Sequence, residues 1–253
     1  MISAAALPGI PEVRAGDDPA GLIADALARP GAPAAATGAV LVVAHKLISK
    51  AEGRTRRLVD VSPSARALEL AERLGGKDPR HVQVVLDETR AVRRAERGVL
   101  ISETHHGFVC ANAGVDASNT AEDDSVIMLP LDPDASARRL RAGLSQRTGS
   151  TLAVIVTDSF GRAWRHGQCD VAIGCAGLAP LDDWRGRADR RGRDLKATVI
   201  AIADELAAAA DLVRTKDGGQ PAAIITGMAR VTCVEDGPGV APLLRGADTD
   251  LFR

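Results

Sequence analysis

Residues 112–119 bring several groups capable of chemistry into eight positions. The octet reads Asn-Ala-Gly-Val-Asp-Ala-Ser-Asn, and it offers the Asp116 carboxylate, two amides and a hydroxyl beside a glycine. It follows an apolar run at 108–111 and precedes the acidic turn 122–124. Its small residues leave room for a ligand to reach the backbone, and loops of this kind often carry function. A purely structural loop can have the same composition, so the interpretation depends on finding a second carboxylate near Asp116.

A second carboxylate follows the apolar run 152–156, where the chain continues Thr157-Asp158-Ser159. We predict a buried strand that ends abruptly there, which would place Asp158 at the rim of a sheet, where ligands usually bind. If the strands before Asp116 and Asp158 are neighbours, the two carboxylates converge with the Ser159 hydroxyl. These hard oxygen ligands suit Mg²⁺ or Mn²⁺ working together with substrate phosphates. The alternative is that both aspartates cap turns, as aspartates at strand ends often do.

The segment 45–54, which follows a predicted strand at 39–44, is rich in cations and hydroxyls. His45, Lys46, Ser49 and Lys50 lie close together in it. Such a concentration at one strand end suits a phosphate-bearing ligand. The alternative is a solvated loop with salt bridges.

The absence of common motifs narrows the class of chemistry. The chain has no G-x-x-x-x-G-K-[ST] phosphate loop and no G-x-G-x-x-G after a strand. It also lacks the G-x-S-x-G and H-E-x-x-H motifs of common serine hydrolases and zinc proteases. What remains is a metal–phosphate chemistry with an unfamiliar nucleotide site.

Both helices and strands are predicted to position these groups, and the predicted fold class is α+β. Helices are predicted after Asp17 or Asp18, at 62–76, from Asp78, at 132–147, at 195–213 (the longest), and briefly at 240–244. Strands are predicted at 39–44, 98–102, 107–112, 125–129, 152–156 and 221–226, and residues 171–178 are predicted to be a strand or a glycine-bent segment. The arginine-rich run 90–97 is predicted to be a helix surface or loop, and 215–220 to be a flexible loop that can bind an anion.

Composition indicates an ordinary globular protein, with 45% apolar and 26% charged residues in 253. A net charge of −1 argues against a nucleic-acid partner, and so does the scarcity of aromatic residues. Four cysteines without C-x-x-C spacing indicate reduced thiols, mostly buried. With neither a signal peptide nor an apolar run of about 20 residues, we expect a cytoplasmic protein that does not cross a membrane.

Taken together, the motifs resemble those of the coenzyme F420-0:L-glutamate (γ-glutamyl) ligases, in order and over nearly the whole chain. The matching segments are 9–18 (Gly-Ile-Pro-Glu-Val-Arg-Ala-Gly-Asp-Asp), 48–54 (Ile-Ser-Lys-Ala-Glu-Gly-Arg), 112–119, 129–134, 157–162 (Thr-Asp-Ser-Phe-Gly-Arg), 164–168 (Trp-Arg-His-Gly-Gln), 183–187 and Gly227. The resemblance implies a single ligase domain over 1–253, with a two-lobed α+β fold, mixed β-sheets with flanking helices, and an intertwined homodimer.

The resemblance also implies an activity. Members of this family use GTP together with a divalent metal, Mg²⁺ or Mn²⁺. Two such ions are expected, and K⁺ is a further candidate ion. They join L-glutamate to F420-0 or its dehydro form and then add further glutamates through γ-linkages. Phosphoryl transfer from GTP would convert the acceptor carboxylate into an acyl phosphate, which the glutamate amine attacks. No protein nucleophile is needed, in agreement with the missing motifs.

Site roles carry over by motif. Asp116 and Asp158 are implied to bind one metal ion, and Ser159 a second. The implied GTP contacts are Ile10, Pro11, Glu12, Val13, Lys50 and Asn119. Nucleotide contacts are also implied at His45 and Lys46, which stand where the family often has hydroxyl groups before Ile-Ser-Lys. In the late nucleotide loop only Lys216 and the glycines match, so Lys216 is the contact implied there.

Two alternatives remain open at this level. One is a related ligase that glutamylates another acid, for example a folate, on the same scaffold. The other is a module that binds nucleotide and metal without catalysis, although such a module has no need of paired metal carboxylates.

Overall fold

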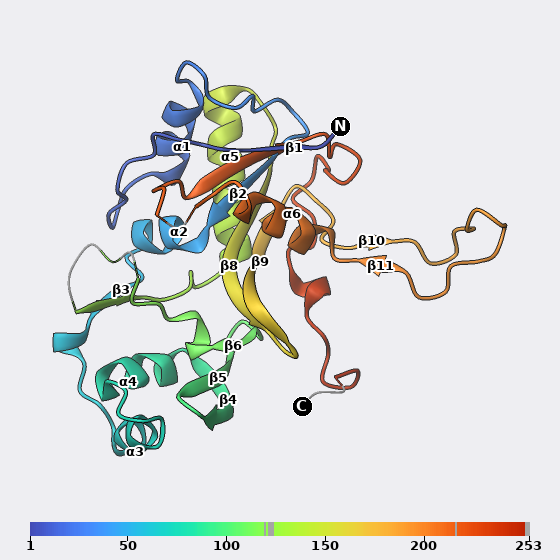
Figure 1. Ribbon diagram of the computed structural model, residues 1–253. Helices are drawn as coiled ribbons and strands as arrows, with labels where there is room; N and C mark the ends of the chain where they lie inside the picture. Colours follow the sequence, from blue (N-terminus) through green and yellow to red (C-terminus); the bar gives the residue numbers. More distant parts are fainter. Residues whose placement is uncertain (119, 121–123, 216, 251–253) are drawn as a thin grey trace.

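A five-stranded sheet forms the centre of the protein in the computed structural model, which describes residues 1–118, 120, 124–215 and 217–250 (Figure 1). Its strand order is β1-β12-β2-β8-β9. The bounds are β1 Ser3–Ala6, β12 Ala222–Thr226, β2 Val40–Ala44, β8 Ala153–Arg162 and β9 Arg165–Ala176. Only β2 and β8 pair in parallel. The apolar runs predicted to be buried strands at 39–44, 152–156 and 221–226 are confirmed as parts of this sheet.

Helices α1 (Pro19–Leu27), α5 (Pro133–Thr148) and α6 (Ile202–Asp211) surround the sheet. The sequence specifies where the first two begin, because the side chains of Asp18 and Asp132 accept backbone N–H bonds before a proline in the first turn. Helix α5 ends at Gly149, which adopts the left-handed conformation. Helices α5 and α6 pack against β9, and α1 packs against α5.

A second group of elements has its own apolar core. Helices α3 (Ala65–Arg73) and α4 (Pro79–Asp87) pack near a sheet of β4 (Thr89–Glu96), β5 (Val99–Thr104) and β6 (Val109–Ala111). The short strands β3 (Thr55–Arg57) and β7 (Ser125–Ile127) pair with each other. Buried side chains such as Leu70, Val85 and Leu100 form a cluster separate from the one around the central sheet. The α+β class with mixed sheets and flanking helices is therefore confirmed.

Two charged segments adopt structures other than those predicted. Residues 90–97, predicted as a helix surface or loop, lie mostly in strand β4, because pairing with β5 supplies the backbone bonds. The arginines are accommodated there because Arg90 and Arg93 pair with the buried Glu103 of β5. Residues 45–54, interpreted as a strand exit or loop, begin with helix α2 (His45–Ala51) directly after β2.

The helix predicted at 195–213 is also wrong in its first part. It begins only at Ile202, so α5 is the longest helix in the described part of the chain. Residues 182–200 form an arm that extends away from the body (Figure 1), with β10 (Asp182–Asp183) pairing antiparallel with β11 (Val199–Ile200). Residues 195–200, which helical propensity assigns to the helix, therefore belong to the paired arm instead.

Three short 3₁₀ turns complete the description: η1 (Leu58–Asp60), η2 (Asn112–Gly114) and η3 (Ala241–Leu243), the last where a short helix was predicted at 240–244. All four cysteines are free, with Cys110 and Cys175 buried. Among the described residues, no helix combines the length and apolar character needed to cross a membrane.

Candidate active site

A cleft of about 710 Å³ opens between α2, the β8–β9 hairpin and the loop after α6. It collects most of the residues singled out from the sequence. The predicted residues that line it are Ile10, Pro11, Glu12, Val13, His45, Lys46, Lys50, Asp116, Asp158 and Ser159. Asn119 and Lys216 lie outside the described residues, although the neighbouring Ser118, Thr215 and Asp217 line the cleft.

The parallel pair β2 and β8 explains one side of the cleft. Ala44 at the end of β2 lies opposite Thr157, so from Asp158 onward β8 has lost its β2 neighbour and pairs only with β9. The strand does not end at residue 156 as predicted but continues to Arg162. A register shift between Val156 and Thr157 marks a bulge, a device that re-aims side chains next to functional sites. Asp158 therefore lies just beyond the point where β2 ends, while its own strand, β8, continues past it.

Asp116 reaches the same cleft from a different sheet. The strand before it, β6, belongs to the β4-β5-β6 sheet, so the two aspartates do not follow neighbouring strands, the arrangement under which convergence was expected. Asp116 instead exchanges two backbone hydrogen bonds with Ile127 at the end of β7, with N···O distances of 3.0 and 2.8 Å. The convergence of Asp116 and Asp158 is nevertheless confirmed, since both line one cleft and the charge of Asp116 raises the pKa of Asp158.

A tight backbone turn immediately precedes Asp116 and directs the chain toward the cleft. Asn112, Ala113 and Gly114 all have positive φ, at 52°, 51° and 72°. At Gly114 a side chain is sterically excluded, because a Cβ would come within 2.7 Å of the buried Leu129. The small residues of the octet are thus needed to form the turn, in addition to leaving the backbone accessible.

Lys46 pairs directly with Asp116. Its Nζ lies 2.7 Å from Asp116 Oδ2 and also donates to Ser118 Oγ at 2.7 Å. Burial alone would raise the pKa of Asp116, but the hydrogen bonds from Lys46 and Ser118 outweigh it and leave the pKa lowered. Asp116 is therefore a carboxylate at neutral pH, held by a cation in the first turn of α2.

Asp158 is in the opposite electrostatic situation. Burial raises its pKa, against the charge of His45 and the backbone N–H of Ser159, and the charges of Asp116 and Asp170 raise it further. His45 Nε2 lies 3.4 Å from Asp158 Oδ1, while its Nδ1 is 3.1 Å from Ser49 Oγ. The imidazole is 2% exposed, and burial lowers its pKa, so at pH 7 it supplies no full positive charge to Asp158.

The uncompensated negative charge around Asp158 shows whether these residues fit a divalent cation. Asp158 is a half-buried carboxylate with carboxylate neighbours and a neutral imidazole, an environment that a cation would relieve. In the described part of the chain no group of three or more His, Cys, Asp and Glu is arranged around a common metal position. Two carboxylates and the Ser159 hydroxyl still fit Mg²⁺ or Mn²⁺, because these ions complete their shells with water and substrate phosphates. The donor set fits the metal.

Lys50 provides a second cation, on the last turn of α2. It forms an ion pair with Glu12 and so ties the irregular segment 10–13 to the helix. Ile10 and Val13 are buried and anchor this segment in the core, while Glu12 is exposed. The two predicted nucleotide contacts, 10–13 and Lys50, are therefore one physical unit.

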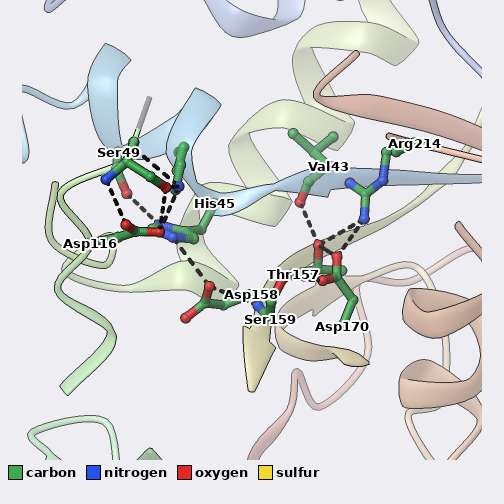
Figure 2. Close-up of polar contacts among 11 residues, drawn as sticks. Val43, His45, Ser49, Asp116, Thr157, Asp158, Ser159, Asp170 and Arg214 are labelled. Carbon is green, nitrogen blue, oxygen red and sulfur yellow. Dashed lines mark hydrogen bonds and ion pairs between the residues drawn. The ribbon is translucent and has the colours of Figure 1, made fainter. Parts of the chain in front are cut away.

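Sequence reasoning missed a buried network behind Ser159. Asp170 of β9 accepts hydrogen bonds from Ser159 Oγ at 2.7 Å and Thr157 Oγ1 at 2.8 Å, and from Arg214 Nη2 at 2.6 Å (Figure 2). Asp170 and Arg214 are 5% and 7% exposed. Ser159 lies directly opposite Asp170 in the β8–β9 register. A hairpin prediction over 157–171 would have paired these two residues, whereas nothing local marks Arg214.

Comparison with known proteins matches a family and several named relatives. The family model described as F420-0:Gamma-glutamyl ligase matches residues 9–227. A protein of Methanothermobacter thermautotrophicus named Coenzyme F420:L-glutamate ligase is 46% identical over 253 residues, covering 100% of this chain and 99% of the relative. A protein of the same name from Methanopyrus kandleri is 45% identical over 244 residues, covering 96% and 94%. Another from Archaeoglobus fulgidus is 43% identical over 221 residues, covering 87% and 85%.

Proposed function

Because the chain belongs to the F420-0:γ-glutamyl ligase family, we propose that it joins L-glutamate to coenzyme F420-0, or its dehydro form, with GTP as the energy source, and then adds further glutamates through γ-linkages. Membership of this family makes the chain an amide-bond-forming ligase. The observation that carries the finer proposal is the cleft, where Asp116 and Asp158 from different sheets face the same space as Lys46 and Lys50.

The proposed reaction runs in two steps. An oxygen of the acceptor carboxylate attacks the γ-phosphorus of GTP, the bond to the β–γ bridging oxygen breaks, and GDP leaves. The amine of glutamate then attacks the acyl carbon, and inorganic phosphate leaves with the oxygen that had bridged carbon and phosphorus, while the amine gives up a proton. Both steps depend mainly on positioning and on neutralised phosphate charge. This agrees with a cleft of carboxylates and lysines.

Asp116 and Asp158 would hold one divalent cation, and Ser159 would hold a second. Bound there, such ions neutralise phosphate charge and orient the reacting oxygens. The chain contributes the placement: the Ile127 backbone fixes Asp116, and the Ser159 N–H donates to Asp158 Oδ1 at 2.8 Å. Asp170 holds the Ser159 hydroxyl from behind.

The lysines of α2 would bind the nucleotide phosphates. Lys50 lies at the cleft wall against Glu12, and Lys46 lies against Asp116. Each ammonium group is already held by a carboxylate, so it is positioned before the phosphate arrives and needs little reorganisation. Lys46, whose Nζ also donates to Ser118 Oγ, would place its charge beside a phosphate oxygen bound next to Asp116.

We further propose that the protein works as a homodimer, as the resemblance implies. The arm at 182–200 is the segment best placed to contact a second copy, because it extends from the body and exposes Val199 (Figure 1). Sedimentation at micromolar concentration tests this: a mass of two chains supports the dimer, and a mass of one chain excludes it.

The function itself is tested by measuring GDP release in the presence of each substrate combination. Release that requires F420-0, glutamate and divalent metal together, with a product heavier than F420-0 by one or more glutamyl units, supports the proposal. Glutamylation of a folate but not of F420-0 would place the chain with a related ligase. GTP binding without any GDP release would leave only a binding module.

A further inference from the structure

His45 is the first residue of α2, and its imidazole lies against Asp158. The parallel register that pairs Ala44 with Thr157 brings these two residues together, one position further along each chain. The imidazole is buried, yet it lines the cleft together with Asp158. The family often has a hydroxyl group at this position, so the imidazole is a feature of this chain that the proposed reaction leaves without a role.

One ring nitrogen of His45 has a hydrogen-bond partner and the other has none. Nδ1 lies 3.1 Å from Ser49 Oγ, one turn further along α2 (Figure 2). Nε2 is buried, and it forms no hydrogen bond with any of the residues that the structure describes. Buried polar atoms nearly always have a partner, so an orphaned one indicates an ion or a water molecule as its natural partner.

The orphaned nitrogen is directed at the Asp158 carboxylate. It lies 3.4 Å from Asp158 Oδ1, without a hydrogen bond between the two atoms (Figure 2). Two ligands of one metal ion, each about 2.1 Å from it, are at most about 4.2 Å apart. The separation of Nε2 and Oδ1 is therefore compatible with both atoms binding the same ion.

Ser49 holds the imidazole as the outer-shell residues of metal sites do. A histidine that binds a metal through one nitrogen usually donates the N–H of the other to an oxygen, which fixes the ring and its tautomer. Ser49 Oγ provides such an oxygen, and the residue is completely buried. An Nδ1–H donated to Ser49 leaves the lone pair of Nε2 facing Asp158, which is what a histidine ligand requires.

A simple ion pair between a protonated His45 and Asp158 is the competing explanation. It would need Nε2–H to donate to the carboxylate, and that hydrogen bond is not formed. A protonated imidazole would also be a buried charge next to the ammonium group of Lys46, which already pairs with Asp116. The geometry therefore favours a ligand over a charge partner.

We propose that His45 Nε2 is a ligand of the divalent ion bound by Asp158, and that it shifts the preference of this site from Mg²⁺ toward transition metals such as Co²⁺ or Zn²⁺. Imidazole nitrogen suits transition metals, whereas Mg²⁺ takes oxygen ligands. Water and substrate phosphate complete the shell of the ion. This proposal rests on the proposed function, because it concerns the same metal site.

The first test detects histidine nitrogen bound to the ion. Full-length protein is loaded with Mn²⁺, alone and with GDP, and pulsed EPR measures the nitrogen nuclei that couple to the Mn²⁺ electrons. A bound histidine predicts a ¹⁴N coupling that changes to the ¹⁵N pattern when the protein is produced with ¹⁵N-histidine. His45→Ser, which introduces a hydroxyl group, should remove this coupling, whereas His105→Ser, outside the cleft, should retain it.

Calorimetry measures the change in metal preference. His45→Ser should weaken Co²⁺ binding about tenfold or more, because even an outer-shell partner of a metal is worth about 10- to 100-fold in affinity. Mg²⁺ binding should weaken less, so the ratio of the two affinities falls. Ser49→Ala should weaken Co²⁺ binding about tenfold and keep the nitrogen coupling. Circular dichroism checks that each variant is folded.

The outcomes separate this proposal from the proposed function. Wild-type protein that binds Mn²⁺ without a histidine coupling would overturn the ligand role, with no need of a variant, and would leave the ligase activity intact. A coupling that persists in His45→Ser belongs to another histidine and would also overturn it. A coupling from His45 in protein that does not glutamylate F420-0 would support the ligand role and refute the function. Protein that binds no divalent ion, with or without GDP, would refute both.

Discussion

Arg214 donates to Asp170 across 2.6 Å, and both side chains are buried directly behind the cleft. The pair joins the loop after α6 to strand β9, and through Asp170 it reaches the hydroxyl of Ser159. Asp170 therefore holds the hydroxyl of Ser159, a proposed metal ligand. Arg214 begins the loop that was expected to contact GTP.

Replacing Asp170 by asparagine should lower the free energy of unfolding by about 3 kcal/mol, because it leaves the Arg214 guanidinium buried without a counter-charge. Chemical denaturation measures this. Asp87→Asn is the matched control, since Asp87 pairs with Arg56 on the surface, where such a pair contributes about 1 kcal/mol or less. Equal, small losses in both variants would show that the buried pair has no special weight.

Asp116→Asn and Asp158→Asn should each reduce metal-dependent GTP turnover by at least about 100-fold, because even outer-shell partners of a metal are worth about 10- to 100-fold. Circular dichroism should show the fold intact, since both carboxylates face the cleft. Turnover like that of wild type in either variant would remove that aspartate from the metal site.

Lys50→Ala should weaken GTP binding about tenfold or more in calorimetry, because it removes a charged hydrogen-bond donor from the cleft wall. Lys77→Ala, in the turn between α3 and α4 and outside the cleft, serves as the control and should bind GTP as wild type does. If the two variants have the same affinity, Lys50 does not contact the nucleotide.

Gly114→Ala should destabilise the protein by about 2–4 kcal/mol, the sum of a positive-φ penalty and a forced shift of Leu129. Gly75→Ala separates the two causes, because Gly75 has φ of 86° but no atom within 4 Å of an added Cβ. It should lose only about 1–2 kcal/mol. A loss at Gly114 no larger than that at Gly75 would mean that Leu129 yields without cost.

The parts of the fold that follow from local chemistry were predictable. Asp18, Asp78 and Asp132 begin helices because a side-chain oxygen before a proline satisfies a free backbone N–H. The apolar runs were strands because a central sheet buries both faces. By contrast, β4 could not be distinguished from a charged helix, since its partner β5 determines its structure.

The site shows the same division. The types of Asp116 and Asp158 indicated metal ligands, but their meeting depends on Asp116 bonding to Ile127 and on β2 ending opposite Thr157. Both are long-range relations. Asp170 needed the exact register of the β8–β9 hairpin, and Arg214 needed the path of the loop after α6. Spacing along the chain could have indicated Asp170 through a hairpin prediction, but it contains nothing that indicates Arg214.

The central claim is that the acceptor carboxylate is activated by phosphoryl transfer in the cleft. Its most direct test is a reaction with GTP, glutamate and F420-0 labelled with ¹⁸O in both carboxylate oxygens, followed by mass spectrometry of the released phosphate. For the first glutamate added, an acyl phosphate predicts one ¹⁸O in the released phosphate, one retained in the new amide, and GDP formed in equal amount. Later additions activate an unlabelled glutamate carboxylate and release unlabelled phosphate. Product with one glutamate formed together with unlabelled phosphate would contradict the account.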